Sequence, residues 1–395
     1  MKYLFGSAVI VACSPAMAMA LGLDRSTQPV DIIFEEGNYA QFSYGRVFPD
    51  ASGEDSRLAL PDGTVIVPGG GRSGDVIEDF NQFGAAIKYQ ITERFSGSLI
   101  LDEPYGLDLA YPGDGLLSFG GTYANVDSYG VSAIGRYVFD NDFSVHAGLR
   151  YQSIEALVGL SGAAVAGLDG YRAEFDRDWD LGYIVGAAYE RPEIALRVAL
   201  TYISGTDHRL DTRETVNGIG ADLLTGGALS ASSVTEIETP DAVHLDLQTG
   251  IAPDTLLFGS VRYAWYGDTI VSPVFYDLAN EPERQNTSLT EIRDGAAYTL
   301  GLARQFNDVL GGSIAVGYEP EDDDDLVSPL SPVNGNTSVA LGLSYAVNDA
   351  LTVSGGASYV WLGDARPETG TPDIERARFT DNDTVGFGLR IGYRF

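Results

Sequence analysis

Alternating apolar and small or polar residues at the C-terminal end of the chain predict a membrane-spanning β-strand. In residues 384–395 the apolar side chains occupy every second position and end with Phe395, whereas glycine and arginine fill the positions between them. A period of two places alternate side chains on opposite faces of a strand. About ten such residues suffice to cross a bilayer as a tilted strand that faces lipid on one side.

The same alternation recurs along the chain and predicts an all-β protein, a transmembrane antiparallel β-barrel of fourteen strands. An even strand count is typical of a single-chain bacterial barrel. The expected strands are residues 39–48, 81–91, 95–102, 127–139, 143–152, 179–189, 194–202, 243–251, 257–265, 298–302, 310–318, 339–347, 351–361 and 384–395.

The connections between these strands alternate between short and long. Every second connection is a tight polar turn such as 92–94, 140–142 or 252–254, with the Asn, Asp and Pro residues of short hairpins. Short periplasmic turns and long outer loops are typical of barrels in the bacterial outer membrane. The sequence therefore predicts a protein of the outer membrane of a Gram-negative bacterium, in contact with its lipid and lipopolysaccharide.

The N-terminal residues have the three regions of a secretory signal. Lys2 precedes an apolar run over residues 3–12, and small residues follow up to Ala20. The alternative, a membrane-anchored helix, requires about 20 apolar residues, and Pro15 interrupts the run before that length. We expect residues 1–20 to be a signal peptide, which also contains Cys13, the single cysteine of the chain.

Charge and composition exclude several functional classes. The chain has 24 basic and 56 acidic residues, a formal charge of −32, which disfavours nucleic acid as a partner. We find no motif for a cofactor, for a metal ion or for energy coupling, and expect none of these. The three histidines, His146, His208 and His244, show no hydrolase-like spacing to a serine, so an enzyme is the weakest alternative.

Several stretches resemble the FadL-type transporters of long-chain fatty acids and hydrocarbons. They are residues 101–107, residues 183–190 with 194–204, and residues 238–243 with 261–265. The resemblance implies a monomeric barrel over residues 39–395, a plug formed by residues 21–38, and an inward kink of the third strand that opens sideways into the membrane. The terminal Phe395 resembles the signal bound by the barrel-assembly machinery.

Two apolar stretches in predicted outer loops are candidates for binding a hydrophobic small molecule. Residues 156–168 carry no charge, and residues 218–229 carry one aspartate. Exposed apolar patches often mark binding sites, and the resemblance implies a ligand-collecting groove between these loops. The alternative is that the loops pack on each other as a lid. The candidate residues are Leu157, Val158, Leu160, Val165, Leu168, Leu223, Leu224 and Leu229.

Two inward-facing arginines and one proline stretch complete the candidate site. Arg150 and Arg197 are candidates for binding a carboxylate, with salt bridges to lumenal aspartates as the alternative. Pro104 cannot donate a hydrogen bond to a neighbouring strand, so strand pairing should fail at Pro104, Tyr105 and Gly106, which we predict to form a lateral gate. Alternatively, Pro104 marks the start of the second outer loop.

The sequence therefore favours passive transport of long-chain fatty acids or similar hydrophobic compounds. A general or substrate-selective diffusion porin is the main alternative, because it would share the barrel and differ in having a wide, water-filled lumen. A structural or adhesive barrel is a third alternative. Which hydrophobic compound is carried is not encoded in any motif that we identify.

Overall fold

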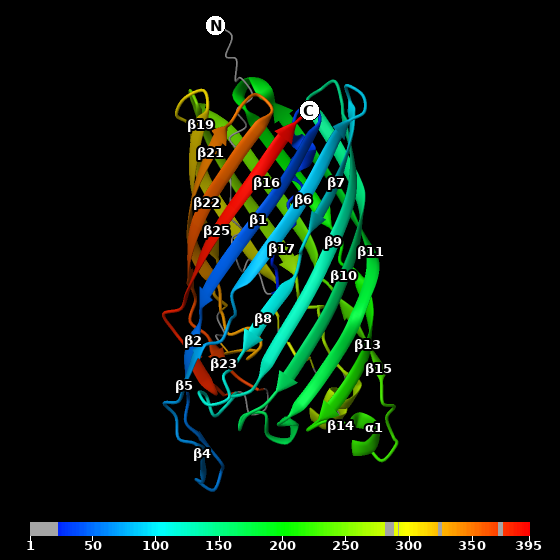
Figure 1. Ribbon diagram of the computed structural model, residues 1–395, viewed down its shortest axis with the longest axis vertical. Helices are drawn as coiled ribbons and strands as arrows, with labels where there is room; N and C mark the ends of the chain where they lie inside the picture. Colours follow the sequence, from blue (N-terminus) through cyan, green and yellow to red (C-terminus); the bar gives the residue numbers. More distant parts are fainter. Residues whose placement is uncertain (1–22, 281–287, 291, 323–325, 370–373) are drawn as a thin grey trace.

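The protein is a closed antiparallel β-barrel of fourteen strands, which confirms the predicted fold (Figure 1). A computed structural model describes residues 23–280, 288–290, 292–322, 326–369 and 374–395. The expected signal peptide therefore lies outside the described residues.

Three barrel strands are each interrupted and carry two labels. The strands are β1 (Tyr39–Asp50), β6 (Phe80–Gln90), β7 (Phe95–Asp102) with β8 (Gly106–Ala110), β9 (Tyr123–Val138), β10 (Phe143–Leu160), β11 (Tyr171–Arg191), β12 (Leu196–Ile203) with β13 (Asp207–Val216), β15 (Ser233–Glu238) with β16 (Asp241–Ala252), β17 (Thr255–Trp265), β18 (Gly295–Gln305), β19 (Leu310–Glu319), β21 (Asn336–Ala346), β22 (Leu351–Leu362) and β25 (Asp383–Arg394).

The first and last strands close the barrel. β1 pairs with β25 from Tyr39 opposite Arg394 to Asp50 opposite Asp383, and on its other side β1 pairs with β6. Neighbouring strands in the wall are also neighbours in the sequence, as in an up-and-down barrel. Closure satisfies the backbone groups of the wall from within the sheet, which is necessary in lipid because no water is available there.

The outward face of the wall is apolar. In β25, Phe387 and Leu389 are 52% and 43% exposed, and Leu341 and Leu343 of β21 are exposed in the same way. Aromatic side chains stack on the outward face, as Tyr151 does with Trp179 within β10 and β11 and Tyr393 with Phe395 at the C-terminal end. These features fit a wall surrounded by lipid with aromatic residues at its interfaces. No helix among the described residues has the length and hydrophobicity to span a bilayer.

Short turns and long loops lie at opposite ends of the barrel, as predicted (Figure 1). The C-terminus lies at the end with the short turns, and the loop elements project from the other end, which we call the outer end. The outer elements are β2 (Ser52–Asp55), β3 (Leu58–Ala59), β4 (Val65–Val67), β5 (Arg72–Asp75), η2 (Ala166–Leu168), β14 (Ile219–Gly220), α1 (Ala221–Leu224), α2 (Val274–Asn280), β20 (Leu326–Val327), β23 (Arg366–Pro367) and β24 (Ala377–Phe379). The remaining elements are η1 (Asp31–Phe34) in the N-terminal segment and η3 (Pro192–Ile194) in a short turn.

The outer loops pack into a cap with its own apolar core. β2 pairs with both β5 and β24, and this small sheet joins the first and last outer loops. Phe119, Phe379 and Tyr111 are buried together in the core of the cap. The loops therefore cover the outer end of the barrel as one packed unit, because each contributes apolar side chains to the same cluster.

The fifth and sixth strands are longer than the sequence predicted. The expected strands end at Gln152 and begin at Trp179, whereas β10 continues to Leu160 and β11 begins at Tyr171. Residues 156–160, expected to lie in a solvent-facing loop, therefore form part of the sheet. The alternation of the membrane strand changes here because a bulge shifts the register between Ile154 and Ala156, and apolar side chains beyond it point into the cap.

Candidate functional site

The barrel wall has a break between β6 and the third strand. β7 and β8 appear as separate arrows in Figure 1, and residues 103–105 lie between them. Pairing of β6 with β7 ends at Ala85 opposite Leu101. Among the described residues, the next backbone hydrogen bond across this gap joins the N–H of Glu78, just before β6, to the Asp108 carbonyl oxygen of β8, at 2.9 Å. We call this gap in the pairing the window.

On its other side the third strand stays attached to β9. β7 pairs with β9 up to Asp102 opposite Gly130, and β8 resumes this pairing at Gly106 opposite Asp127. Between them, the Ser128 hydroxyl donates to the Tyr105 carbonyl oxygen at 2.6 Å and accepts from the Tyr105 N–H at 2.7 Å. The break therefore opens toward β6 alone, at the residues around Pro104.

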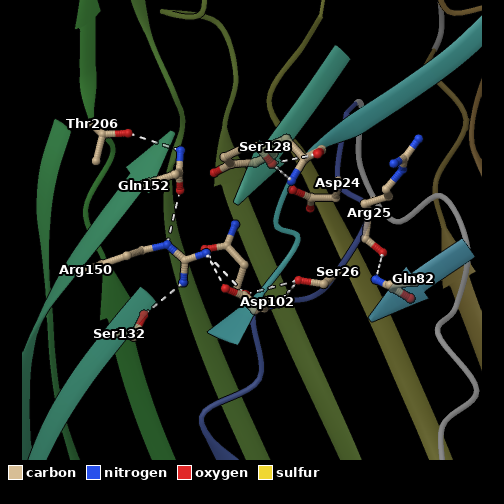
Figure 2. A network of polar contacts seen from close by, with 12 residues as sticks. Asp24, Arg25, Ser26, Gln82, Asp102, Ser128, Ser132, Arg150, Gln152 and Thr206 are labelled. Atoms are coloured by element: carbon tan, nitrogen blue, oxygen red, sulfur yellow. Dashed lines mark hydrogen bonds and ion pairs between the residues drawn. The ribbon is translucent and has the colours of Figure 1, made fainter. Parts of the chain in front are cut away.

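The N-terminal segment lies in the window and pairs with the third strand through an isolated β-bridge (Figure 2). Asp24 forms an antiparallel bridge with Tyr105. The Arg25 N–H donates to the Pro104 carbonyl oxygen at 2.9 Å, and the Gly106 N–H donates to the Leu23 carbonyl oxygen at 3.0 Å. These bonds satisfy backbone groups of the third strand. In a continuous wall, the neighbouring strand β6 would satisfy them.

Side chains of β6 and of the third strand complete this closure. The Gln82 amide donates to the Arg25 carbonyl oxygen, which connects the inserted segment to β6. The Glu103 carboxylate accepts a hydrogen bond from the Phe83 N–H at 3.3 Å and so spans the gap directly. The window is thus closed by side chains and by a segment of the N-terminus, not by continuous strand pairing.

Asp24 anchors the inserted segment inside the barrel. Its carboxylate lies 2.6 Å from the guanidinium of Arg262 on β17 and accepts a hydrogen bond from the Tyr266 hydroxyl at 2.8 Å. All three side chains are buried. Removing one partner of a buried ion pair costs about 3–5 kcal/mol, because the other charge is left without compensation. This contact therefore holds residues 23–26 in the window.

Arg25 points the opposite way, into the window itself. Its guanidinium pairs with Asp108 on β8 and lies 3.6 Å from Asp127 on β9, and it stacks over the ring of Phe80 on β6 at 4.8 Å. The Arg25 side chain is only 9% exposed. It passes so close to Gly106 that a Cβ atom at that position would overlap it, so any side chain there would have to displace Arg25.

A small apolar cavity adjoins the inner side of the window. Its volume is about 50 Å³, and no polar atom faces it. Leu23 of the inserted segment and Tyr105 of the window form part of its wall, and residues of the outer cap close it on the side of the outer end. The other lining residues are Leu107, Ala124, Val126, Ile154, Ala156, Val158, Phe175, Ile237, Thr239, Pro240, Tyr266, Thr269, Val271, Leu289, Thr290 and Leu330.

A larger cavity of about 1010 Å³ extends along the lumen from the short turns to beyond the level of the window. Its wall is mixed, and we call it the polar cavity because charged side chains of the lumen lie in that wall. Phe34 of η1 lies in its wall between the guanidinium groups of Arg136 and Arg197, at 4.6 and 4.5 Å from their Cζ atoms. Glu35 contacts Arg394 at 3.3 Å, and burial raises the pKa of this carboxyl while Arg394 opposes the shift. The cavity wall also includes Gln82 and Phe83 beside the window.

The two predicted arginines occupy different surroundings. Arg150 is buried, pairs with Asp102 at 3.2 Å, and hydrogen-bonds Gln152 and Ser132 (Figure 2). It therefore takes part in the lumenal salt bridging that the sequence left open as an alternative. Arg197 stacks on Phe34 in the wall of the polar cavity, and no salt bridge to it is found among the described residues.

The predicted loop residues are not brought together in one groove. Val158, Leu160 and Leu168 are buried in the core of the cap, and Val165 packs against that core, so the expected exposed patch at 156–168 is wrong. Val158 instead lines the apolar cavity. In the other loop Leu223 is 73% exposed and Leu224 is also exposed. Leu157 is partly buried on β10, Leu229 is partly buried beyond α1, and neither lines the cavity.

Sequence analysis missed the residues that close the window. Asp24 and Arg25 belong to the segment predicted as a plug, but nothing near them in the sequence indicates their partners, which lie up to 242 positions away. The period of two along the ninth strand places Arg262 on the inward face of the wall, where its charge needs a partner. That unpaired buried charge was the available signal, because it requires a carboxylate from another part of the chain.

Comparisons with known proteins agree with this architecture. The model of a family described as "Outer membrane protein transport protein (OMPP1/FadL/TodX)" matches residues 43–395. Among solved structures, a Pseudomonas aeruginosa FadL homologue aligns with a TM-score of 0.73 at 14% identity, covering 93% of this chain and 92% of the other. The toluene transporter TbuX of Ralstonia pickettii aligns at 0.61 and 14%, covering 96% and 97%. The toluene transporter TodX of Pseudomonas putida aligns at 0.60 and 12%, covering 91% of each chain. A comparison with curated protein sequences gives no match.

Proposed function

Because the chain belongs to the outer-membrane transport family OMPP1/FadL/TodX, we propose that it carries hydrophobic compounds passively and releases them sideways through the window. Long-chain fatty acids and similar hydrocarbons are the proposed cargo. The observation that supports this most directly is the contact between the apolar cavity and the window, since Leu23 and Tyr105 belong to both. A ligand held in the cavity is therefore one side chain away from the lipid.

The cavity suits an apolar ligand because no polar atom faces it. Each CH₂ group removed from water contributes about 0.8 kcal/mol, so binding there needs no charged partner. Its volume of about 50 Å³ is smaller than the ~150 Å³ of an apolar cavity that holds benzene. A ligand must therefore displace a lining side chain, and Leu23 is the lining residue that belongs to the inserted segment.

In the proposed sequence of events, the ligand enters through the outer cap and pushes Leu23 away from Tyr105. The neighbouring hydrogen bonds of Arg25 and Gly106 then break, and residues 23–26 leave the window. The ligand moves between β6 and β8 toward the lipid-facing side chains of Phe83 and Leu101, which are exposed on the wall. No energy source is required, because the compound moves down its own gradient.

The remaining predicted residues have proposed roles that fit these surroundings. The exposed Leu223 and Leu224 on α1 would give a hydrophobic compound its first contact at the outer end. Arg197 would meet a carboxylate in the polar cavity, whereas Arg150 is already engaged with Asp102. We propose that the protein works as a monomer, since the closed barrel contains the whole route.

Replacement of Pro104 by valine tests the lateral route. Valine restores an N–H and a branched side chain that favour strand pairing, so closure between β6 and β8 should tighten. Uptake of labelled oleate and naphthalene by intact cells that express the variant should fall severalfold. The matched control is Pro192→Val in a periplasmic turn, which should leave uptake unchanged. Undiminished uptake of both compounds by Pro104→Val would count against the window as the exit.

A further inference from the structure

The window is framed by acidic side chains and contains a single cation. Asp108 on β8 and Asp127 on β9 both face Arg25, and Glu103 lies across the gap against Phe83. Of the described residues at this position, only Arg25 places a positive group between the two aspartates. Arg177 is the other nearby cation, and its guanidinium pairs with Glu155 and stacks over Tyr129.

Arg25 can occupy this position because the third strand and its pairing with β6 are interrupted at the window. Its guanidinium lies between the Phe80 ring of β6 and the carboxylates of β8 and β9, where a continuous wall would leave no room. The absence of a side chain at Gly106 gives it the necessary space. Any molecule that leaves through the window must take the place of the Arg25 side chain.

We propose that Arg25 is the latch of the window and that Asp108 and Asp127 make the exit selective for uncharged hydrophobic molecules over carboxylates. This proposal rests on the proposed function and, between its two classes of cargo, favours uncharged hydrocarbons over fatty-acid carboxylates. While Arg25 is in place, it compensates the two aspartates. Once it withdraws, both carboxylates line the exit, and Glu103 loses the adjoining segment as well.

The charge of a passing molecule then determines its barrier. An uncharged hydrocarbon crosses the frame without an electrostatic cost, whereas a carboxylate comes within a few ångströms of two like charges beside lipid, where water screens poorly. The apolar cavity behind the window offers a carboxylate no compensating group either, since its wall is apolar. The acidic frame of the window and the apolar cavity therefore both favour uncharged molecules over carboxylates, although they consist of different residues.

The test compares pairs of probes that share a shape and differ in charge. Uptake of naphthalene and 2-naphthoate, and of oleyl alcohol and oleate, is measured at pH 7.5 in porin-deficient cells. Cells that express the wild-type protein should take up the uncharged member of at least one pair about tenfold faster than its carboxylate. Uptake of none of the four probes would reject the proposed function itself, whereas equal uptake within both pairs would reject only the charge selectivity.

The double variant Asp108→Asn/Asp127→Asn removes the acidic frame and keeps similar side-chain shapes. Carboxylate uptake should rise about tenfold while uptake of the uncharged probes changes less than twofold. The matched control, Asp211→Asn/Glu236→Gln, removes two outward carboxylates from β13 and β15 and should leave the selectivity unchanged. Unchanged carboxylate uptake in the first variant would overturn the proposal. Heat-modifiable mobility on gels identifies folded barrels, and the single variant Asp127→Asn replaces the double variant if that one does not fold.

The variant Arg25→Gln tests the role of Arg25 as the latch separately from the charge selectivity of Asp108 and Asp127. Without the guanidinium the window should open more readily, so uptake of the uncharged probes should rise severalfold. The aspartates remain in this variant, so the discrimination against carboxylates should persist. Unchanged uptake of the uncharged probes would remove Arg25 as the latch, and loss of the discrimination would show that Arg25, not the aspartates, determines selectivity.

Discussion

Two of the three interrupted strands of the wall have breaks that are closed in different ways. In the seventh strand, residues 204–206 separate β12 from β13. There the Tyr183 N–H donates to the Ser204 hydroxyl at 2.8 Å, and the Gly205 N–H donates to the Asp241 carboxylate at 2.7 Å. The neighbouring barrel strands β11 and β16 supply these partners, so the break is closed by the wall itself.

The break in the third strand has a different partner. The N-terminal segment, which is not part of the wall, satisfies its backbone groups at Pro104 and Gly106. A break closed by wall strands opens only if the barrel deforms, whereas one closed by an inserted segment opens when that segment leaves. This difference supports the proposal that the wall opens at the third strand.

Deletion of residues 23–26 should have the largest effect on this comparison. The segment supplies the backbone partners of the window, so its loss leaves the window open in every molecule and not in a minor population of about 0.1–10%. We expect passage of hydrophobic probes to rise by about tenfold or more. Uptake by cells and single-channel conductance in planar bilayers measure the change.

A matched deletion keeps this experiment interpretable. Removal of four residues from the exposed tip of the first outer loop, 61–64, shortens the chain equally without touching the window. That deletion should leave both readouts at the wild-type level. A large, steady pore already present in the intact protein would instead favour the diffusion-porin alternative.

Asp24→Asn should weaken the closure without removing the segment. It leaves Arg262 buried without its carboxylate partner, which costs about 3–5 kcal/mol. Hydrogen exchange of the Arg25 and Ser26 amides should accelerate by about two orders of magnitude, since 1.4 kcal/mol corresponds to a factor of ten. Exchange of the Gly205 amide in the other break provides the internal reference. Equal protection of Arg25 in wild type and variant would argue that the ion pair does not hold the segment.

Ser204→Ala should have the smallest effect. It removes one hydrogen bond from the seventh-strand break, for which we expect a loss of about 1 kcal/mol in the free energy of unfolding. Because wall strands still enclose the break, uptake of every probe should stay at the wild-type level. Thermal or urea unfolding in detergent measures the stability. An increase in uptake would show that both breaks can open, and would remove the distinction between them.

Much of the architecture could be predicted from local sequence pattern. A period of two fixes which side chains face lipid, and all fourteen predicted strands coincide with strands of the barrel because lipid imposes that pattern on each strand independently. The position of the break was also predictable, since Pro104 lacks the N–H that pairing requires. These features depend on residues that are neighbours in the chain.

The contents of the window could not be predicted in that way. Asp24 and its partner Tyr266 lie 242 positions apart, and Arg25 and Asp108 lie 83 positions apart. Residues 156–160 were misassigned because an apolar run without charge is compatible both with an exposed loop and with a strand buried beneath a cap. Only the other outer loops decide between these two, by covering the strand.

The sequence by itself determined the barrel, the separation of its short turns from its long loops, and the break in its third strand, because a wall that faces lipid requires the same alternation in every strand. The tertiary structure decided what fills that break and how it is held. Arg25 and Asp24 acquire their roles only when closure of the barrel brings the N-terminus beside β8 and β17, and such distant contacts leave no periodic trace in the chain.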